Sequence, residues 1–173
     1  MISKKGRIQF EEDLYYQYAD YMYTVCYRYV GNREIAEELL NNGFLKVFEN
    51  FKKFEDRGQN SLRSWIKKIM INECLMFLRS KNDFELIEIE SLDKNLYLIN
   101  PDNEIDDQIF FLIKKLPTGY RTVFNLYAIE GYTHAEIARK LNINESTSRS
   151  QLTMARKILK EHLIKIGYDA VGK

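Results

Sequence analysis

Residues 133–160 read THAEIARKLNINESTSRSQLTMARKILK and carry the most specific local signal in the chain. Thr133 and Glu136 have the S/T-x-x-E spacing of a capping box. In this motif the threonine hydroxyl accepts a hydrogen bond from the glutamate amide, and the glutamate carboxylate accepts one from the threonine amide. Asn142 follows the short helix that this box starts, and asparagine tolerates the left-handed conformation of a tight turn. Asn144 is a good N-cap for a second helix. The stretch therefore predicts a helix-turn-helix.

The second helix of this motif has one apolar face and one polar, basic face. Ser148, Leu152, Ala155 and Leu159 recur at helical spacing and are expected to point inward. On the other side, short polar groups can reach base edges in a major groove while cations bind phosphates. An ordinary solvated surface helix is the alternative. We expect DNA contacts from Thr147, Arg149, Ser150, Gln151, Met154, Arg156 and Lys157.

Helical periodicity also dominates the N-terminal half. Apolar residues recur every three or four positions from Phe10 to Val30, which predicts one amphipathic helix. A second helix is predicted from Glu34 to Phe51, and its first acids suit the positive end of the helix dipole. After a polar loop, Ser61 can cap a third helix. These three helices predict a first domain.

Charge divides the chain into three blocks. Residues 1–81 hold 14 Lys+Arg against 11 Asp+Glu, residues 82–111 hold 1 against 9, and residues 112–173 hold 11 against 5. The formal net charge of +1 therefore conceals an acidic centre between two basic ends. Basic ends favour polyanionic partners, whereas the acidic centre either avoids them or only keeps the two parts apart.

The predicted fold class is all-α, with two small helical domains joined by an acidic linker. The first domain is assigned to residues 8–81, the linker to 82–103 and the second domain to 104–168. The hydrophobic residues of the linker lack a sustained period. Helical spacing resumes in the second domain, where Pro117 ends one helix and Gly131 ends the next.

Several classes of function are disfavoured by composition. Cys26 and Cys74 are too far apart for a spaced zinc site and are expected to be core thiols, and no metal is expected at His134 or His162. The sequence has no apolar run of membrane-spanning length. We therefore expect a soluble, cytoplasmic protein without cofactor, metal or membrane insertion.

Two stretches resemble one protein family. Residues 36–48, AEELLNNGFLKVF, followed by Phe54 and by residues 61–69, SLRSWIKKI, resemble domain 2 of extracytoplasmic-function (ECF) sigma factors, within the sigma-70 family. Residues 116–159 resemble domain 4 of the same family. The two matches occur in the family's order and together cover nearly the whole chain.

The resemblance implies a non-catalytic initiation factor that binds core RNA polymerase and promoter DNA, with an anti-sigma protein as its inhibitor. Domain 2 of that family docks on the polymerase clamp and opens the minus-10 element, and domain 4 binds the minus-35 element. The residues that resemble the core-binding surface are Glu38, Leu39, Asn42, Phe44 and Lys46. Packing within the domain is an equal alternative for Leu39 and Phe44.

The loop at residues 55–60 and the helix after it match the part of the family that captures an unstacked base. Such capture needs a pocket of polar groups, and a melted strand needs cations along its phosphates. Trp65 could stack on a base, but packing within the domain is favoured for it. The minus-10 residues implied by the match are Gln59, Asn60, Ser61, Arg63, Lys67 and Lys68.

The chain departs from the family pattern in domain 4. Asn142, Ser148 and Gln151 stand where the family commonly has glycine, valine and arginine. Loss of an arginine that reads bases leaves the preferred minus-35 sequence unpredicted. A stand-alone operator-binding regulator is the second hypothesis, and an enzyme, for which the sequence offers no catalytic constellation, is the third.

Overall fold

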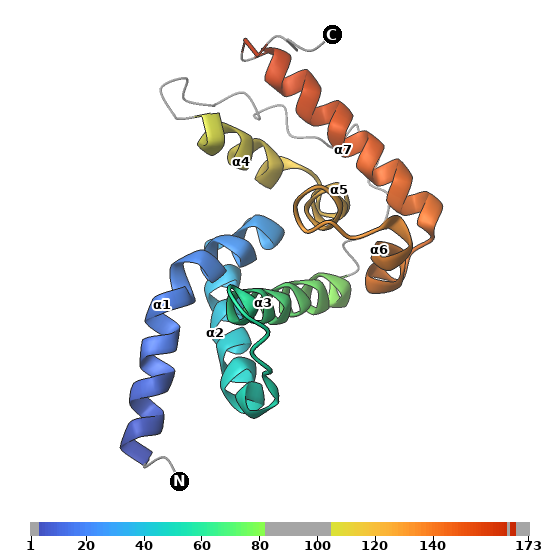
Figure 1. The fold of residues 1–173 in the computed structure, drawn as a ribbon. Coiled ribbons are helices and arrows are strands. Elements are labelled where there is room, and N and C mark those ends of the chain that lie inside the picture. Colours follow the sequence, from blue (N-terminus) through green and yellow to red (C-terminus); the bar gives the residue numbers. More distant parts are fainter. Residues whose placement is uncertain (1–3, 82–104, 166, 169–173) are drawn as a thin grey trace. The chain divides into compact units, whose positions relative to one another are not determined.

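The computed structural model describes residues 4–81, 105–165, 167 and 168, and the regular elements in these ranges are helices (Figure 1). Contacts divide the chain into two compact units, Met1–Phe77 and Leu78–Lys173. The predicted all-α class with two helical domains is thus confirmed. The predicted acidic linker lies outside the described residues, and the predicted domain limits stay predictions. Within the described ranges, no helix has the length and apolar character needed to cross a membrane.

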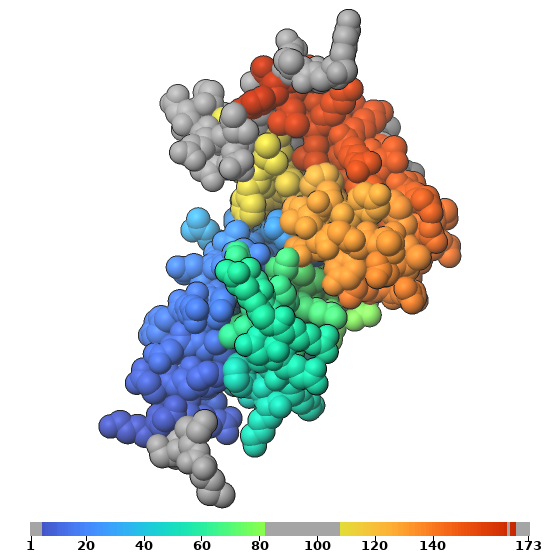
Figure 2. Space-filling view, viewed as in Figure 1, coloured from blue at the N-terminus to red at the C-terminus, as the bar shows by residue number. Residues whose placement is uncertain are grey.

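The first unit contains α1 (Lys4–Val30), α2 (Arg33–Asn50), the 3₁₀ turn η1 (Phe51–Lys53) and all but the last three residues of α3 (Ser61–Ser80). The three long helices correspond to the three predicted from periodicity. On the face shown in Figure 2, the atoms of α1 and those of the segment around η1 adjoin. This arrangement brings the N-terminal turns of α1 beside the end of α2.

α1 begins earlier than the predicted start at Phe10. Arg7 Nε lies 2.7 Å from Glu11 Oε1, and Gln9 Nε2 donates to Asp13 Oδ1 at 2.9 Å. Such pairs, four residues apart, stabilise a helix by roughly 0.2–0.5 kcal/mol each. They support the first turns of α1, which lack the apolar periodicity used to predict the helix.

The core of the first unit requires a close approach of α2 and α3. A Cβ on Gly43 would lie 2.2 Å from Met70 Sδ, so a side chain there would displace a buried methionine. One turn later, Lys46 Nζ lies 2.6 Å from Glu73 Oε1, whose side chain is 8% exposed. Buried hydrophobic residues around this crossing include Met22, Val25, Cys26, Tyr29, Phe44, Ile66, Met70 and Cys74.

The two cysteines are both free and both buried in this core. A hydrogen bond with Cys26, together with burial, holds the pKa of the Cys74 thiol well above its ordinary value. The Cys74 thiol is therefore protonated at neutral pH. The prediction that they pack in the core is confirmed.

The second unit contains α4 (Ile105–Lys115), α5 (Thr118–Phe124), the π-helical turn η4 (Asn125–Ile129), α6 (His134–Leu141) and α7 (Glu145–Lys165). α7 packs against α4, α5 and α6. The core that results includes Leu112, Ile113, Leu116, Tyr120, Ala155, Ile158 and Leu159.

A buried arginine closes the end of α4. Pro117 separates α4 from α5, as predicted. Arg121 Nη1 donates to the carbonyl oxygens of Lys114 at 2.7 Å and of Leu116 at 3.2 Å. The Lys114 carbonyl belongs to the last turn of α4 and the Leu116 carbonyl follows directly after it, where helix geometry leaves acceptors unsatisfied. Arg121 therefore fixes the corner between the two helices.

The predicted capping box and turn of the helix-turn-helix are present. Thr133 Oγ1 accepts from the Glu136 amide at 3.3 Å, and Glu136 Oε2 accepts from the Thr133 amide at 2.8 Å. The bond from the Thr133 amide is the main cause that lowers the pKa of Glu136. Asn142 has φ 56° and ψ 45°, the left-handed conformation expected of it. The Ile143 amide donates to the Ala138 carbonyl at 3.1 Å and closes the turn.

This turn gives the first testable prediction. Asn142→Val should lower the free energy of unfolding of the second unit by about 1–2 kcal/mol, because a β-branched side chain disfavours positive φ. Asn142→Gly should leave it within roughly 0.5 kcal/mol of the original, since glycine adopts this conformation freely. Urea unfolding of both variants measures the difference. Equal stability of the two variants would show that the turn is not left-handed in solution.

Candidate nucleic-acid interface

α7 carries an outer face made of polar and basic side chains. Arg149, Ser150, Arg156 and Lys157 are exposed, as predicted, and Thr147 is half-buried. Arg149 forms an ion pair with Glu145 one turn earlier. Spacing of three and four residues adds further exposed positions to the same face. The outer face of α7 comprises Ser146, Arg149, Ser150, Thr153, Arg156, Lys157 and Lys160.

Sequence reasoning missed Ser146, Thr153 and Lys160. Each lies three or four residues from a predicted member, so the same helical spacing could have found them. Thr153 Oγ1 donates to the Arg149 carbonyl at 3.0 Å, which turns its hydroxyl toward its own helix. Lys160 extends the basic face by one turn.

The predicted DNA contact at Gln151 conflicts with its burial, whereas the predicted contact at Met154 stays a prediction. Gln151 is fully buried, and its Nε2 lies 3.0 Å from where a Cβ on Gly119 would stand. Met154 is half-buried and packs against the core cluster. At 100° per residue, Gln151 and Met154 follow Thr147 along a different stripe from Arg149 and its neighbours. That stripe turns toward the rest of the second unit because α5 packs on α7 in addition to α6.

His134 connects the beginning of α6 to the buried side of α7. Its Nδ1 lies 2.9 Å from the Ser148 hydroxyl, and its ring stacks on Tyr127 with centroids 4.5 Å apart. Burial first, and then the positive charges of Arg149 and Arg156, lower the pKa of His134. The ring is therefore neutral near pH 7. Ser148, which replaces the family's valine, thus has a polar partner inside the motif.

In the first unit, Asp56 organises the loop before α3. Its Oδ1 accepts from the Gly58 amide at 3.0 Å and from the Ser61 hydroxyl at 2.7 Å. The bond from Ser61, followed by that from Gly58, lowers the pKa of Asp56. Asn60 holds a left-handed φ of 69°. Hydrogen bonds within the loop thus fix its shape. The Ser61 hydroxyl takes part in one of them, so it is not a free polar group.

The predicted minus-10 residues lie on one continuous segment, the loop and the first two turns of α3. Gln59, Asn60, Arg63 and Lys68 are exposed, and Ser61 and Lys67 are half-buried. The Arg63 guanidinium stacks on the ring of Tyr21 from α1, with Cζ 3.8 Å from the ring centroid. Sequence patterns do not predict this partner, because Tyr21 belongs to a helix about forty residues earlier.

A cavity of about 390 Å³ lies beside this loop. Trp65 forms part of its wall and contacts the ring of Phe54 at a centroid distance of 5.3 Å. Trp65 is half-buried, so it packs in the domain and still borders open space. The cavity lining combines aromatic, basic, acidic and hydroxyl groups: Lys53, Phe54, Glu55, Arg57, Ser61 and Trp65.

The predicted core-binding residues on α2 divide between surface and interior. Glu38 and Asn42 are exposed. Leu39 and Phe44 are 5% and 1% exposed, so packing within the domain, the stated alternative, holds for both. Lys46 directs its ammonium group to Glu73 and is a structural ion-pair partner.

Exposed positions on α2 also include a residue that sequence reasoning missed. Leu45 is 60% exposed, a high value for a leucine. It follows Glu38 and Asn42 at helical spacing, and Asn41 and Glu49 are exposed as well. The outer face of α2 is therefore defined as Glu38, Asn41, Asn42, Leu45 and Glu49.

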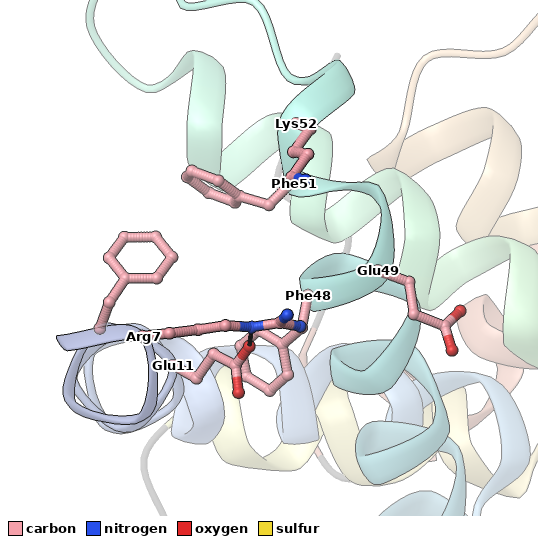
Figure 3. Close-up of a pocket in the computed structure, with 7 residues that line it drawn as sticks. Arg7, Glu11, Phe48, Glu49, Phe51 and Lys52 are labelled. Carbon is pink, nitrogen blue, oxygen red and sulfur yellow. Dashed lines mark hydrogen bonds and ion pairs between the residues drawn. The ribbon is translucent and has the colours of Figure 1, made fainter. Parts of the chain in front are cut away.

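A second groove borders the N-terminal turns of α1 (Figure 3). It has a volume of about 560 Å³. Arg7 and Glu11 of α1 line it together with Phe48 and Phe51. Phe10 packs edge-on against Phe51 with centroids 4.7 Å apart. The groove carries cations and carboxylates together and so has no dominant charge.

Comparisons with known proteins agree with the order of the two units. The family model described as Sigma-70 region 2 matches residues 14–84, and the model described as Sigma-70, region 4 matches residues 106–159. The chain is 28% identical over 174 residues to the ECF RNA polymerase sigma factor SigW of Bacillus subtilis, covering 92% of each. It is 26% identical to the ECF sigma factor SigE of Mycolicibacterium smegmatis, covering 89% of this chain. The chain spans 62% of the length of that SigE.

Two helical units, one with an organised loop before a basic helix and one with a helix-turn-helix, define a helical DNA-binding protein of two domains. The two region matches, in family order, together with relatives such as SigW, make the assignment specific. The chain belongs to the sigma-70 family of RNA polymerase initiation factors, in its ECF group.

The corrected position of Gln151 gives the second testable prediction. Gln151→Ala should lower the thermal midpoint of the second unit without changing which promoter bases are preferred, because Gln151 packs inside. Ser150→Ala, one residue away on the outer face, should instead leave the midpoint unchanged and alter base preference. Thermal unfolding and selection from a promoter library measure these two effects. Altered base preference in Gln151→Ala at unchanged stability would contradict the buried position.

Proposed function

We propose that this chain gives core RNA polymerase its promoter choice and helps to open the DNA, without catalysing a reaction itself. The observation that carries the proposal is the pair of exposed surfaces, one in each unit, that offer cations beside short polar groups. One surface is formed by the loop at residues 55–60 and the first turns of α3, and the other is the outer face of α7. Membership of the sigma-70 family supports the same role.

On the upstream side, we assign the minus-35 element to the outer face of α7. Arg149, Arg156 and Lys157 are exposed cations that suit phosphates and release counterions on binding. Ser150 lies among them and is short enough to approach base edges. The Thr133–Glu136 capping box starts α6, and the bond of His134 to Ser148 joins α6 to α7, which supports a surface that is ordered before DNA binds.

On the downstream side, we assign the melted minus-10 strand to the loop and the start of α3. The cavity beside the loop is lined by Trp65 and Phe54, whose rings suit the faces of an unstacked base. Lys67 and Lys68 follow on α3 and suit the phosphates of a single strand. The Asp56 hydrogen bonds hold the loop in shape, which reduces the entropy that binding would cost.

We assign polymerase docking to the outer face of α2. Leu45 offers an apolar side chain at the centre of polar and acidic neighbours, the pattern of an interface anchor with a polar rim. Glu38 and Asn42 remain from the predicted set, whereas Leu39, Phe44 and Lys46 act by holding α2 in place.

Location and inhibition follow from the same assignment. A protein that acts on chromosomal promoters with core polymerase works in the cytoplasm. An anti-sigma protein would inhibit it by covering the outer face of α2 or the surface of α7, since both must be free to act.

The polymerase surface gives the third testable prediction. The double variant Asn42→Ala, Leu45→Ala should reduce co-purification with core polymerase at least tenfold, because an apolar anchor and its polar neighbour are lost together. Met76→Ala is the matched control, since Met76 is an exposed apolar residue on α3. Circular dichroism verifies that both variants keep their helical content. Wild-type co-purification by the double variant would reject this face of α2.

The loop gives the fourth testable prediction. Gln59→Ala and Asn60→Gly should slow open-complex formation more than they weaken polymerase binding, because both groups lie where the strand is to be captured. Glycine is used at Asn60 because it retains the positive φ. Promoters melted in advance should restore much of the rate. Equal defects on duplex and melted templates would argue against a role in opening.

A further inference from the structure

Arg63 and Tyr21 form a stacked pair that joins α3 to α1 at the surface of the first unit. The Arg63 Cζ lies 3.8 Å from the centroid of the Tyr21 ring. This is well within the approximately 6 Å over which cation–π attraction acts. Arg63 is exposed and Tyr21 is 38% exposed, so the pair borders solvent.

The guanidinium carbon of Arg63 lies over the face of the Tyr21 ring, where cation–π attraction favours a cation. Arginine commonly stacks in parallel on an aromatic face. In that orientation one face of the guanidinium is turned to Tyr21, and the opposite face is available to a second flat group.

The pair lies beside the residues assigned to the melted strand. Arg63 follows Gln59 and Asn60 closely in sequence, and Lys67 comes one helical turn after it on α3. A guanidinium plane is a good stacking partner for a nucleobase, and a lysine nearby suits the adjoining phosphate. Stacking on Tyr21 restricts the side chain of Arg63 in advance, so less entropy is lost when a base arrives.

We propose that Tyr21 and Arg63 form a stacking platform for one unpaired nucleobase of the melted strand, which extends the DNA-binding surface from α3 onto α1. This inference rests on the proposed minus-10 function of the loop and α3. In it, Arg63 contacts the base, and Tyr21 is a positioning residue that keeps the guanidinium flat.

The test compares variants of Tyr21 and Arg63 with a matched control, all in complex with core polymerase. Tyr21→Leu removes the ring and keeps an apolar side chain, Tyr21→Phe keeps the ring, and Tyr16→Leu is the matched control. Tyr16 is a tyrosine of the same helix that is 80% exposed. The probes are single-stranded minus-10 oligonucleotides that carry 2-aminopurine, whose fluorescence is quenched by stacking, at successive positions.

We expect Tyr21→Leu to weaken oligonucleotide binding about tenfold, because Arg63 loses the ring that restricts its side chain before the base arrives. Quenching should be lost at one position, while Tyr21→Phe and Tyr16→Leu behave like the original protein. Adding Tyr21→Leu to Arg63→Ala should cause little further loss, since the two side chains act as one unit. An abasic site at that position should abolish the difference between Tyr21→Leu and the original protein.

Other outcomes separate the platform from the function on which it rests. If Arg63→Ala weakens binding but Tyr21→Leu does not, the platform is wrong and the minus-10 assignment stands. If an abasic site leaves the effect of Tyr21→Leu intact, Arg63 contacts a phosphate and the platform is also wrong. If neither Arg63→Ala nor Gln59→Ala affects binding of the single strand, the minus-10 assignment itself fails.

Discussion

The width of the buried face on α7 is the constraint on which DNA binding by the second domain depends. α7 packs against α5 as well as α6, so Gln151 and Met154 turn inward beside Ser148 and Ala155. The side chains of α7 that stay exposed form a narrow stripe along the helix. Arg149, Arg156 and Lys157 lie together on this stripe. Packing therefore selects which side chains can meet DNA. The same principle acts on α2, where burial of Leu39 and Phe44 leaves Leu45 and Asn42 outside.

Local hydrogen bonds turn these faces into rigid surfaces. The Asp56 carboxylate shapes the loop before α3, and the Thr133–Glu136 capping box starts α6. Arg121 closes the corner between α4 and α5. Each of these networks joins residues close in sequence, and the first belongs to the loop that we assign to the minus-10 strand. The polar groups that contact DNA can therefore be few, because their positions are fixed before binding.

Periodicity and capping signals were enough to predict the all-α class, the helices and the helix-turn-helix, because these depend on neighbours within one turn. The capping box and the left-handed Asn142 illustrate this. Contacts between distant segments were not predictable in this way. Gln151 was predicted to face DNA, but it packs beside Gly119 of another helix. Lys46 was predicted to bind polymerase, but it pairs with Glu73 on α3. The stacking of Arg63 on Tyr21 was missed for the same reason.

The central claim is that the two surfaces act on promoters only together with core RNA polymerase. Transcription of genomic fragments by purified core polymerase, with and without this chain, tests it most directly. The account predicts that discrete start sites appear when the chain is added, and that the chain alone binds the same fragments weakly and without preference. Tight, sequence-specific binding by the free chain, with no new start sites in the presence of polymerase, would contradict the account and indicate a stand-alone regulator.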